Sequence, residues 1–526
     1  KTVVLCTDIF SEFMEMNHLY PKALSDIDDD QILQYFLKAR LPQRLIADLY
    51  AFLGAISSPI AVRSSSLLED SHYQPFAGIY STYMVPQNTE SKTHMLVMIT
   101  EAIKAVYASV FFRDSKAYMT ATKNVIDEEK MAIVLQEICG NHYGTRYYPS
   151  FSGVARSLNY YPIGPEQPED GIANIALGLG KYIVDGGVTL RFSPSYPNNV
   201  LQTSTLEFSL RETQTYFNAL DLSKISFVPQ VDDGFNLVKV RVQDAMADGT
   251  LRYIASTFDV QNEIIQDGLY EGRKVITFAN ILKHDVYPLA DILKEVLHIA
   301  QNEMGRPIEI EFAVNLDYSE KKQHTFYLLQ IRPIVDSKEM VHEDIGAIES
   351  NNTIISSKSA LGHGITNDLF DVVYVRTEAF NASKNQFIAY DLEKINKRLV
   401  AENRPYVLIG PGRWGSSDHW LGIPVKWPQI SNARVIVESG LEQYRIDPSQ
   451  GTHFFQNLTS LGVSYFTINP FQKDGTYDLD FLDNCAAEYE SQYIRHVHFD
   501  QPLVVKVDGR KNMGVVMKPD TTIHNA

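Results

Sequence analysis

Two apolar segments near the middle of the chain, IEIEFAV at 308–314 and LLQIRPI at 328–334, carry polar residues at alternate positions. Alternate residues of a β-strand share a face. Each segment would therefore present two polar side chains on one face, namely Glu309 and Glu311 on the first and Gln330 and Arg332 on the second. If the two strands pair as a hairpin, two carboxylates, an amide oxygen and a guanidinium converge.

The chemistry of that face allows two interpretations. Carboxylate and amide oxygens are ligands that magnesium prefers, and a guanidinium binds phosphate oxygens in pairs, so the set would suit a magnesium-bound triphosphate. The alternative is an amphipathic hairpin with salt bridges on its solvent face, which the pattern in isolation favours. Two features weigh against it: the polar positions interrupt strongly apolar strands, and Pro333 ends the second strand just beyond Arg332.

A second stretch, AVRSSSLLEDSHYQPFAGIY at 61–80, ends an apolar strand on Arg63 and a row of serines. Such a strand end can point at an anion, and a surface loop explains it equally well. If the stretch binds phosphate, the turn 76–78 (Phe-Ala-Gly) would form a mobile flap, because glycine lets the backbone approach a ligand closely.

Composition excludes several classes of protein. At 526 residues the chain is too long for one core, so about two to four domains are expected. The net charge of −17 argues against nucleic acid and membrane surfaces as partners. Cys6, Cys139 and Cys485 lie far apart without CxxC spacing, which indicates a reducing cytoplasm and neither a disulfide framework nor a zinc ribbon. No run approaches the ~20 apolar residues of a membrane helix, and the first residues read as strand and helix, not as a signal peptide.

The residue pattern changes along the chain. Residues 1–125 mix helical periodicity with short strands, and residues 126–336 are mostly β-like until a helical pattern at 286–304. Residues 337–352 are polar and acidic and read as a linker. Residues 353–526 form a separate α/β region. The predicted fold class is therefore α+β and α/β, in several domains.

Five segments stand in the order and rough spacing of one known family: AVRSSS…ED…FAGIYSTY, VLQEI…FSGVA, ALGLGKYIVDGG, IEIEFAV and LLQIRPI. Together they resemble the nucleotide-binding domain of the phosphoenolpyruvate synthase and pyruvate phosphate dikinase family, over about residues 1–336. The resemblance implies an ATP-grasp fold with subdomains at 1–125 and 126–336. It also implies that ATP and Mg²⁺ bind between them.

The resemblance assigns roles to individual residues. Arg63 matches the family arginine that holds nucleotide phosphates, and Ser64 lies in the same loop. Glu311 matches the second acid of the family's Asp-Ile-Glu, a magnesium and phosphate position. Glu309 stands where the family usually has Asp, and its longer side chain would shift the metal geometry.

Further roles come from the closing strand and from the strand beside the adenine. Gln330 and Arg332 match the family's Gln-x-Arg-Pro, which makes Glu311 and Gln330 the implied metal ligands. Arg63, Arg332 and Glu311 would act on the transferred phosphoryl group. Backbone groups would read the adenine edge at Gln136, Glu137 and Ile138.

Several departures from the family pattern bear on activity. The family's upstream Gly-Gly-Lys has no counterpart, so the chain is expected to begin just after it. A family arginine appears at best as Lys116, and the family's Gly-Leu-Gly-Glu ends here on Lys181. The swivelling phosphohistidine domain is not found; His363 is the nearest candidate, but its neighbours do not match. About 190 residues remain after 336, fewer than the ~250 of a typical (β/α)8 barrel.

The region beyond the linker carries a weaker signal, in the strand exit YVLIGPGRWGSSDHW at 406–420. A glycine-rich turn with an arginine and hydroxyls can cradle phosphate, and a tight turn that packs tryptophans is at least as good an interpretation. A second ligand pocket would be formed by Gly412, Arg413, Ser416 and His453. His496 and His498 share a strand face, but no third ligand at metal spacing accompanies them, so they are read as structural.

The sequence therefore predicts a cytoplasmic phosphotransferase that binds Mg-ATP and carries the nucleotide half-reaction. Its partners would be the nucleotide and a phosphate acceptor on residues 350–526 or on another chain, with no nucleic acid and no membrane. Two alternatives stay open. One is a non-catalytic ATP-binding regulatory module, and the other is a fragment of a larger dikinase.

Overall fold

The computed structural model describes residues 1–69, 78–87, 91–122, 129–159, 162, 165–223, 227–317, 323–334, 350–378, 380–416, 418–444, 463–469, 474–508 and 511–519. Two compact units make up the chain. Unit 1 consists of Lys1–Ser157, Glu169–Val184 and Val188–Pro333. Unit 2 consists of Leu158–Pro168, Asp185–Gly187 and Ile334–Ala526. Mixed helix and sheet in several sheets agrees with the predicted α+β class.

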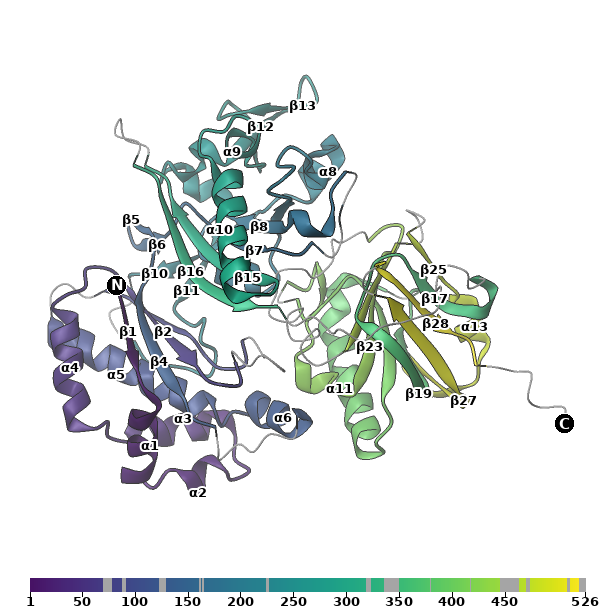
Figure 1. Ribbon diagram of the computed structural model, residues 1–526, viewed down its shortest axis with the longest axis horizontal. Helices are drawn as coiled ribbons and strands as arrows, with labels where there is room; N and C mark the ends of the chain where they lie inside the picture. The colour runs from purple at the N-terminus through teal and green to yellow at the C-terminus, as the bar shows by residue number, and fades with distance from the viewer. Residues whose placement is uncertain are drawn as a thin grey trace. The chain divides into compact units, whose positions relative to one another are not determined.

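The amino-terminal part of unit 1 joins a small sheet to a layer of helices (Figure 1). The sheet has the order β1-β4-β2-β3, and all neighbours are antiparallel. β4 follows residue 125 in the chain and still pairs inside this sheet. The strands are β1 (Thr2–Leu5), β2 (Ile60–Ser65), β3 (Tyr83–Val85) and β4 (Ala132–Glu137). The helices are α1 (Thr7–Met16), α2 (Tyr20–Ala23), α3 (Asp29–Lys38), α4 (Gln43–Leu53), α5 (Lys92–Ser109) and α6 (Arg113–Thr122).

One helical segment, Lys92–Met119, is long and apolar enough to cross a membrane by length and composition. The expectation that no run approaches the length of a membrane helix is therefore wrong when length and composition alone are considered. Of its most apolar window, 78% is buried inside the protein. A helix in the core of a globular protein shows the same burial.

The second part of unit 1 is built on a five-stranded sheet of order β16-β15-β7-β8-β9. All its neighbouring strands are antiparallel. Two smaller sheets accompany it, with orders β11-β10-β6-β5 and β13-β12-β14. The strands of the large sheet are β7 (Phe151–Arg156), β8 (Ile172–Ala176), β9 (Leu190–Phe192), β15 (Ile308–Asn315) and β16 (Thr325–Pro333).

Short elements complete unit 1. The remaining strands are β5 (Asn141–Tyr143), β6 (Arg146–Tyr148), β10 (Tyr216–Asp221), β11 (Leu237–Arg241), β12 (Ala255–Asp259), β13 (Ile264–Asp267) and β14 (Arg273–Ile276). The helices are α7 (Lys181–Val184), α8 (Leu206–Arg211), α9 (Ala279–Leu282) and α10 (Leu289–Met304). α10 lies in the segment where the sequence predicts a helix, 286–304, and it ends at Gly305, whose φ of 65° is a left-handed cap.

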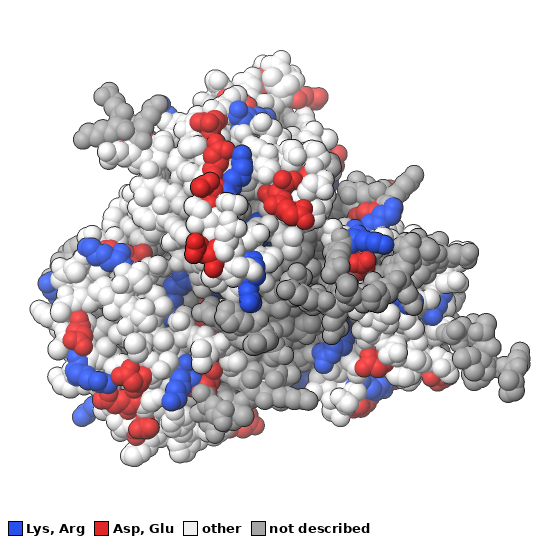
Figure 2. Space-filling model, in the orientation of Figure 1, with Lys and Arg blue, Asp and Glu red and all other residues white. Residues whose placement is uncertain are grey.

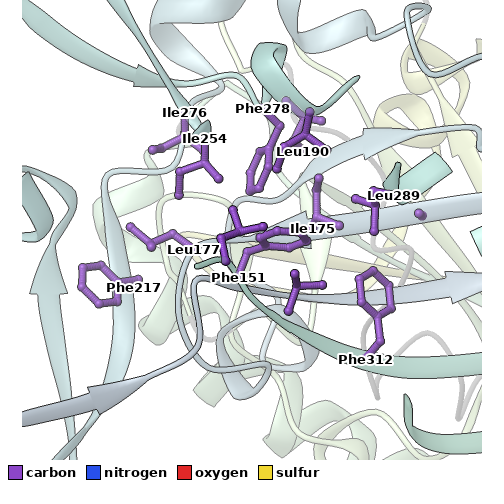
Figure 3. Close-up of a cluster of buried hydrophobic side chains, with 14 of the residues drawn as sticks. Phe151, Ile175, Leu177, Leu190, Phe217, Ile254, Ile276, Phe278, Leu289 and Phe312 are labelled. Carbon is purple, nitrogen blue, oxygen red and sulfur yellow. The ribbon is translucent and has the colours of Figure 1, made fainter. Parts of the chain in front are cut away.

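One apolar core of unit 1 lies on one face of the five-stranded sheet. Phe151, Ile175 and Phe312 point from the strands into this core, where Leu289 of α10 joins them (Figure 3). α10 contributes buried residues at helical spacing, which explains why it packs on this face. Strand residues alternate, so the intervening side chains of β7, β15 and β16 belong to the opposite face.

Unit 2 is organised around a ten-stranded mixed sheet of order β18-β24-β23-β20-β19-β27-β28-β17-β25, with β26 paired to β27. The run β19-β20-β23-β24 is parallel and strongly apolar, as parallel strands usually are. Its helices are α11 (Asn385–Ala401) and α13 (Leu479–Asn484). Its strands are β17 (Thr353–Ser357), β18 (Ala360–Leu361), β19 (His363–Val375), β20 (Tyr406–Pro411), β21 (Arg413–Trp414), β22 (Gly422–Ile423), β23 (Ala433–Ser439), β24 (Ser464–Ile468), β25 (Gly475–Tyr477), β26 (Ala487–Glu490), β27 (Ile494–Asp508) and β28 (Met513–Met517).

Charged side chains of both signs are interspersed on the face drawn in Figure 2. The expectation that nucleic acid is not a partner stays a prediction from the net charge of −17.

Candidate functional site

The predicted hairpin forms, and its polar face is the starting point of the site. β15 pairs antiparallel with β16, with Glu309 opposite Arg332 and Glu311 opposite Gln330. Directly opposite residues of an antiparallel pair share a face, so the structure brings all four side chains onto one face. A register shift between Glu311 and Phe312 leaves one extra residue in β16. Because of this bulge, Phe326 and Phe312 stack on the core face, with their ring centroids 5.1 Å apart.

Arg63 of β2 reaches this face from the sheet of order β1-β4-β2-β3. Its Nη2 lies 2.5 Å from Oε1 of Gln330 and 3.6 Å from Oε2 of Glu311. Its Nη1 donates to Oε1 of Gln136 on β4, at 3.4 Å. The Arg63 side chain is 20% exposed. A residue 267 positions away in sequence therefore shares an acceptor with the hairpin.

Arg332 completes the group. Its Nη2 donates to the same Gln330 oxygen at 2.8 Å and lies 3.9 Å from Oε1 of Glu311. One amide oxygen thus serves two guanidinium groups, and one carboxylate lies between them. Both guanidinium groups are partly exposed, Arg63 at 20% and Arg332 at 12%, and a guanidinium can bind phosphate oxygens in pairs.

Glu309 has a different environment from Glu311, although both lie on the same face. Nε of Arg156 donates to its Oε2 at 2.6 Å, and both side chains are 4% exposed. Arg156 is the residue of β7 opposite Glu309. The sequence analysis missed it. The available signal was a lone arginine in the otherwise small and apolar strand FSGVAR.

The serines after Arg63 divide between the two faces of β2. Ser64 follows Arg63 directly, so it belongs to the opposite face, and Ser65 shares the face of Arg63. The sequence analysis named Ser64 for the phosphate loop. Gly78 has a left-handed φ of 70°, while Phe76 and Ala77 lie outside the described residues.

The residues expected beside adenine form hydrogen bonds to other residues of unit 1. Gln136 lies next to Arg63, as described above. The Oε1 of Glu137 accepts the backbone N–H of Ser57 at 3.0 Å. The backbone N–H of Ile138 donates to Pro59 at 2.8 Å, and its carbonyl accepts the Tyr147 hydroxyl at 2.9 Å. A contact of Ile138 with adenine would have to compete with these bonds, and the adenine assignment stays a prediction.

The two lysines that depart from the family pattern both have partners. Nζ of Lys116 donates to the Ser25 carbonyl at 3.0 Å, and desolvation lowers the pKa of this lysine. Nζ of Lys181 lies 3.0 Å from Oδ1 of Asp233, whose other oxygen accepts the backbone N–H of Thr82 at 2.8 Å. Lys181 therefore joins α7 to the segment that holds β3.

The expected second pocket in unit 2 lies only partly within the described residues. Gly412 has a left-handed φ of 72°, and Arg413 and Ser416 are buried. Ser416 forms hydrogen bonds within its own turn, with Asp418. His453 lies outside the described residues, so the pocket stays a prediction.

His496 and His498 do have an acidic neighbour, contrary to the expectation from spacing alone. Both rings bond Oδ1 of Asp371, at 2.8 and 3.0 Å. Asp371, Glu488 and His498 offer ligand atoms within 4.8 Å of one another. Arg404 donates to both carboxylates at 2.6 Å, and Arg398 lies 3.3 Å from Glu488, so arginines already pair with these carboxylates. Sequence spacing could not reveal Asp371, because cross-strand pairing in β19 and β27 brings it there.

Comparison with known proteins identifies the chain. Residues 1–352, about two thirds of the chain, match the family described as pyruvate phosphate dikinase, AMP/ATP-binding domain. The protein therefore belongs to an ATP-binding phosphotransferase family. Specifically, it is a member of the pyruvate phosphate dikinase AMP/ATP-binding domain family, as the resemblance over residues 1–336 indicated.

Two curated relatives agree with this assignment. The uncharacterized phosphotransferase YvkC of Bacillus subtilis is 25% identical over 331 residues, which cover 63% of this chain and 30% of the relative. Phosphoenolpyruvate synthase of Aeropyrum pernix is 25% identical over 315 residues, which cover 57% of this chain and 32% of the relative. The matched part is thus about a third of the length of either relative.

Proposed function

We propose that unit 1 binds Mg-ATP in an ATP-grasp arrangement and catalyses the nucleotide half-reaction of a phosphoenolpyruvate synthase or pyruvate phosphate dikinase type of phosphotransfer. The observation that carries the proposal is the convergence of Arg63 with Glu311, Gln330 and Arg332 on one face. We place the two subdomains at 1–125 and 126–336, a linker at 337–352 and a further domain at 353–526.

Each side chain of the site has a chemical part in this proposal. Arg63 and Arg332 would donate to the phosphate oxygens, in place of their present acceptor on Gln330. Phosphoryl transfer depends mainly on positioning and on neutralising charge. Two guanidinium groups that already meet at one oxygen are held in a position to do both.

The donor set also fits magnesium. Glu311 supplies a carboxylate and Gln330 an amide oxygen, both hard ligands that Mg²⁺ accepts. A bound ion would neutralise charge on the triphosphate. The protein's own contribution is to hold these two oxygens side by side, on opposite strands of the hairpin.

The phosphate acceptor would be supplied by residues 350–526 or by another chain. The name of the Aeropyrum pernix relative, phosphoenolpyruvate synthase, suggests pyruvate or phosphoenolpyruvate as the final partner. A non-catalytic ATP-binding module is the second candidate, because Lys116 and Lys181 replace family residues and are held in internal contacts.

Substitution of Arg332 tests the site. Arg332→Ala should weaken Mg-ATP binding about tenfold or more, because it removes a charge-assisted phosphate contact, and should change the melting temperature little. Calorimetry measures the first and thermal melting the second. Arg252→Ala, at an exposed arginine that packs on Tyr253, is the matched control. Equal loss of affinity and stability would favour a purely structural salt bridge.

Product analysis separates the catalytic proposal from the alternative. Dikinase-type transfer releases AMP, and an ordinary kinase reaction releases ADP. Chromatography of the nucleotides after incubation with Mg-ATP and pyruvate should show AMP. Binding without either product would support the regulatory module, or an acceptor that another chain supplies.

A further inference from the structure

Strand β3 is the last strand of the sheet of order β1-β4-β2-β3, where it pairs with β2. An edge strand presents backbone N–H and C=O groups that a further strand could bind. In this protein side chains take that place. Oδ2 of Asp233 accepts the backbone N–H of Thr82 at 2.8 Å, and Nδ2 of Asn236 donates to the carbonyl of Met84. These two backbone groups lie two residues apart, as outward-facing groups on one edge of a strand do.

The segment that supplies these side chains, residues 230–236, is called the strap below. The backbone carbonyl of Gln230 accepts the hydroxyl of Tyr83 at 2.6 Å. The ring of Phe235 packs against the ring of Tyr83, with the centroids 6.3 Å apart. Each of the three successive residues 82–84 therefore contacts the strap, through hydrogen bonds and through one pair of rings.

The strap belongs to the second part of unit 1, because it leads directly into β11. Asp233 adds a further contact within that part. Its Oδ1 lies 3.0 Å from Nζ of Lys181, the first residue of α7, and the two side chains are only 20% and 24% exposed. One carboxylate thus joins the edge of the amino-terminal sheet to the helix that follows β8 of the five-stranded sheet.

The same pair of strands carries an arginine of the candidate nucleotide site. Arg63 lies on β2 directly after Val62, which pairs with Tyr83 of β3. The partners of Arg63 on the hairpin, Glu311 and Gln330, belong to the five-stranded sheet. The strap therefore attaches the β2–β3 pair to the second part of unit 1 at a place separate from the Arg63 contact. Two separate attachments fix the orientation of one sheet against another better than one does.

We propose that the strap holds the two parts of unit 1 in the arrangement that binds nucleotide, with Asp233 as a positioning residue for Arg63. The inference rests on the proposed Mg-ATP site and adds what keeps its two halves together before nucleotide arrives. A site that is assembled for only a fraction of the time binds its ligand more weakly by that fraction. Loss of the strap contacts should therefore weaken nucleotide binding, although Asp233 has no part in the chemistry.

Asp233→Ala in the intact chain removes both contacts of the carboxylate. Calorimetry should show that the Kd for Mg-ATP rises about three- to tenfold, as expected if the site is assembled for about a third to a tenth of the time. Asp233→Asn keeps an acceptor oxygen for the N–H of Thr82 and loses the ion pair with Lys181. Its Kd should lie between those of wild type and Asp233→Ala.

Amide hydrogen exchange, measured by mass spectrometry on the peptide that contains Thr82, tests the positioning role itself. Exchange in Asp233→Ala should be about fivefold faster than in wild type, because the N–H of Thr82 loses its acceptor. Saturating Mg-ATP should slow it again, since nucleotide selects the assembled arrangement. A merely structural contact would give faster exchange that Mg-ATP does not reverse.

Asp232→Asn is the matched control, with the same change of charge one residue away. Asp232 is exposed and its Oδ1 accepts the N–H of Gly234 at 2.9 Å, a turn that asparagine forms as well. This variant should bind Mg-ATP like wild type. Equal weakening in Asp232→Asn and Asp233→Asn would overturn the inference, because charge alone would then explain the effect.

The remaining outcomes are distinct. Asp233→Ala that binds Mg-ATP as tightly as wild type overturns the inference, and so does faster exchange that Mg-ATP does not slow. If Asp233→Ala fails to fold, Asp233→Asn with wild-type affinity overturns it. A folded wild-type chain that does not bind Mg-ATP would overturn the proposed function itself, whereas wild-type binding that the Asp233 variants retain would overturn only the role of the strap.

Discussion

At the residue scale, Arg63 joins two sheets of unit 1. It belongs to the sheet of order β1-β4-β2-β3 and contacts the β15–β16 hairpin of the five-stranded sheet, where nucleotide is proposed to bind. Its guanidinium donates to Gln330 on β16 and to Gln136 on β4 at the same time. A planar guanidinium has its donors in a fixed fork, which suits two acceptors in fixed positions better than the single, freely rotating ammonium of lysine. The residue type, and not only its charge, is therefore expected to matter.

Arg63→Lys tests that statement. The variant keeps the positive charge and loses the fork, so Mg-ATP should bind about tenfold more weakly while the melting temperature changes little. Calorimetric titration gives the affinity. Arg44→Lys, at an exposed arginine paired with Asp8 and Glu12, is the control and should bind like wild type. Unchanged affinity in Arg63→Lys would show that charge alone suffices.

Asp371 in unit 2 gives a prediction about stability and pH. Burial alone would raise the pKa of this carboxyl group, but hydrogen bonds from His496, Arg404 and His498 outweigh it and lower the pKa to about 2. A depressed folded-state pKa stabilises the protein fully above the unfolded value near 4, and this contribution is lost as pH falls through about 2.

Asp371→Asn should therefore lower the free energy of unfolding of unit 2 by roughly 1–2 kcal/mol at pH 7. The difference from wild type should shrink by roughly half at pH 3. Urea titrations at pH 7, 5 and 3 measure it. A difference that grows toward acid pH would contradict the assignment.

The sequence predicts residues well where chemistry and spacing coincide. Glu311, Gln330 and Arg332 lie on one face because strand alternation requires it, and the structure adds Arg63 beside them. Arg156 and Asp371 could not be found in this way. Each acts through a neighbour on another strand, and a single sequence contains no record of which strands pair.

At the element scale, the β15–β16 hairpin also shows that a sequence predicts strands but not which strands pair. Alternation of apolar and polar residues predicts the two strands and their common face. The bulge beside Phe312 and the position of β7 on the other edge of β15 depend on tertiary pairing. The helix at 289–304 was predicted by its periodicity, whereas the run at 92–119 was not singled out, because a helix buried all round shows little periodicity.

Gly153 in β7 shows how closely β7 and β15 pack. A Cβ atom on this residue would lie 2.1 Å from the nearest carbon of the Phe312 ring. Gly153→Ala should therefore destabilise unit 1 by about 1–3 kcal/mol through overpacking. Denaturant titration followed by circular dichroism measures the shift.

A matched control and a second-site change make that prediction specific. At Gly180 an added Cβ meets its nearest atom, the Cβ of Ser152, at an ordinary 3.6 Å. Gly180→Ala should leave the midpoint almost unchanged. Phe312→Leu in the Gly153→Ala background should recover part of the loss, because contacting residues couple. Equal midpoints for both alanine variants would contradict the packing argument.

At the scale of the whole molecule, family membership and physical reasoning cover different parts of the chain. The family match spans residues 1–352 and includes every element of the candidate nucleotide site. Unit 2 has its own mixed sheet and core, and the sequence predicted only that it would be a separate α/β region. Its role in supplying a phosphate acceptor stays a proposal.

Direct titration of Mg-ATP into the intact chain is the measurement closest to the central claim. Isothermal calorimetry should give saturable heat with one nucleotide per chain, and Arg63→Lys should weaken it about tenfold. A non-hydrolysable ATP analogue should bind similarly, since the site recognises phosphates before any reaction. A folded chain that gives no heat with millimolar Mg-ATP would contradict the account.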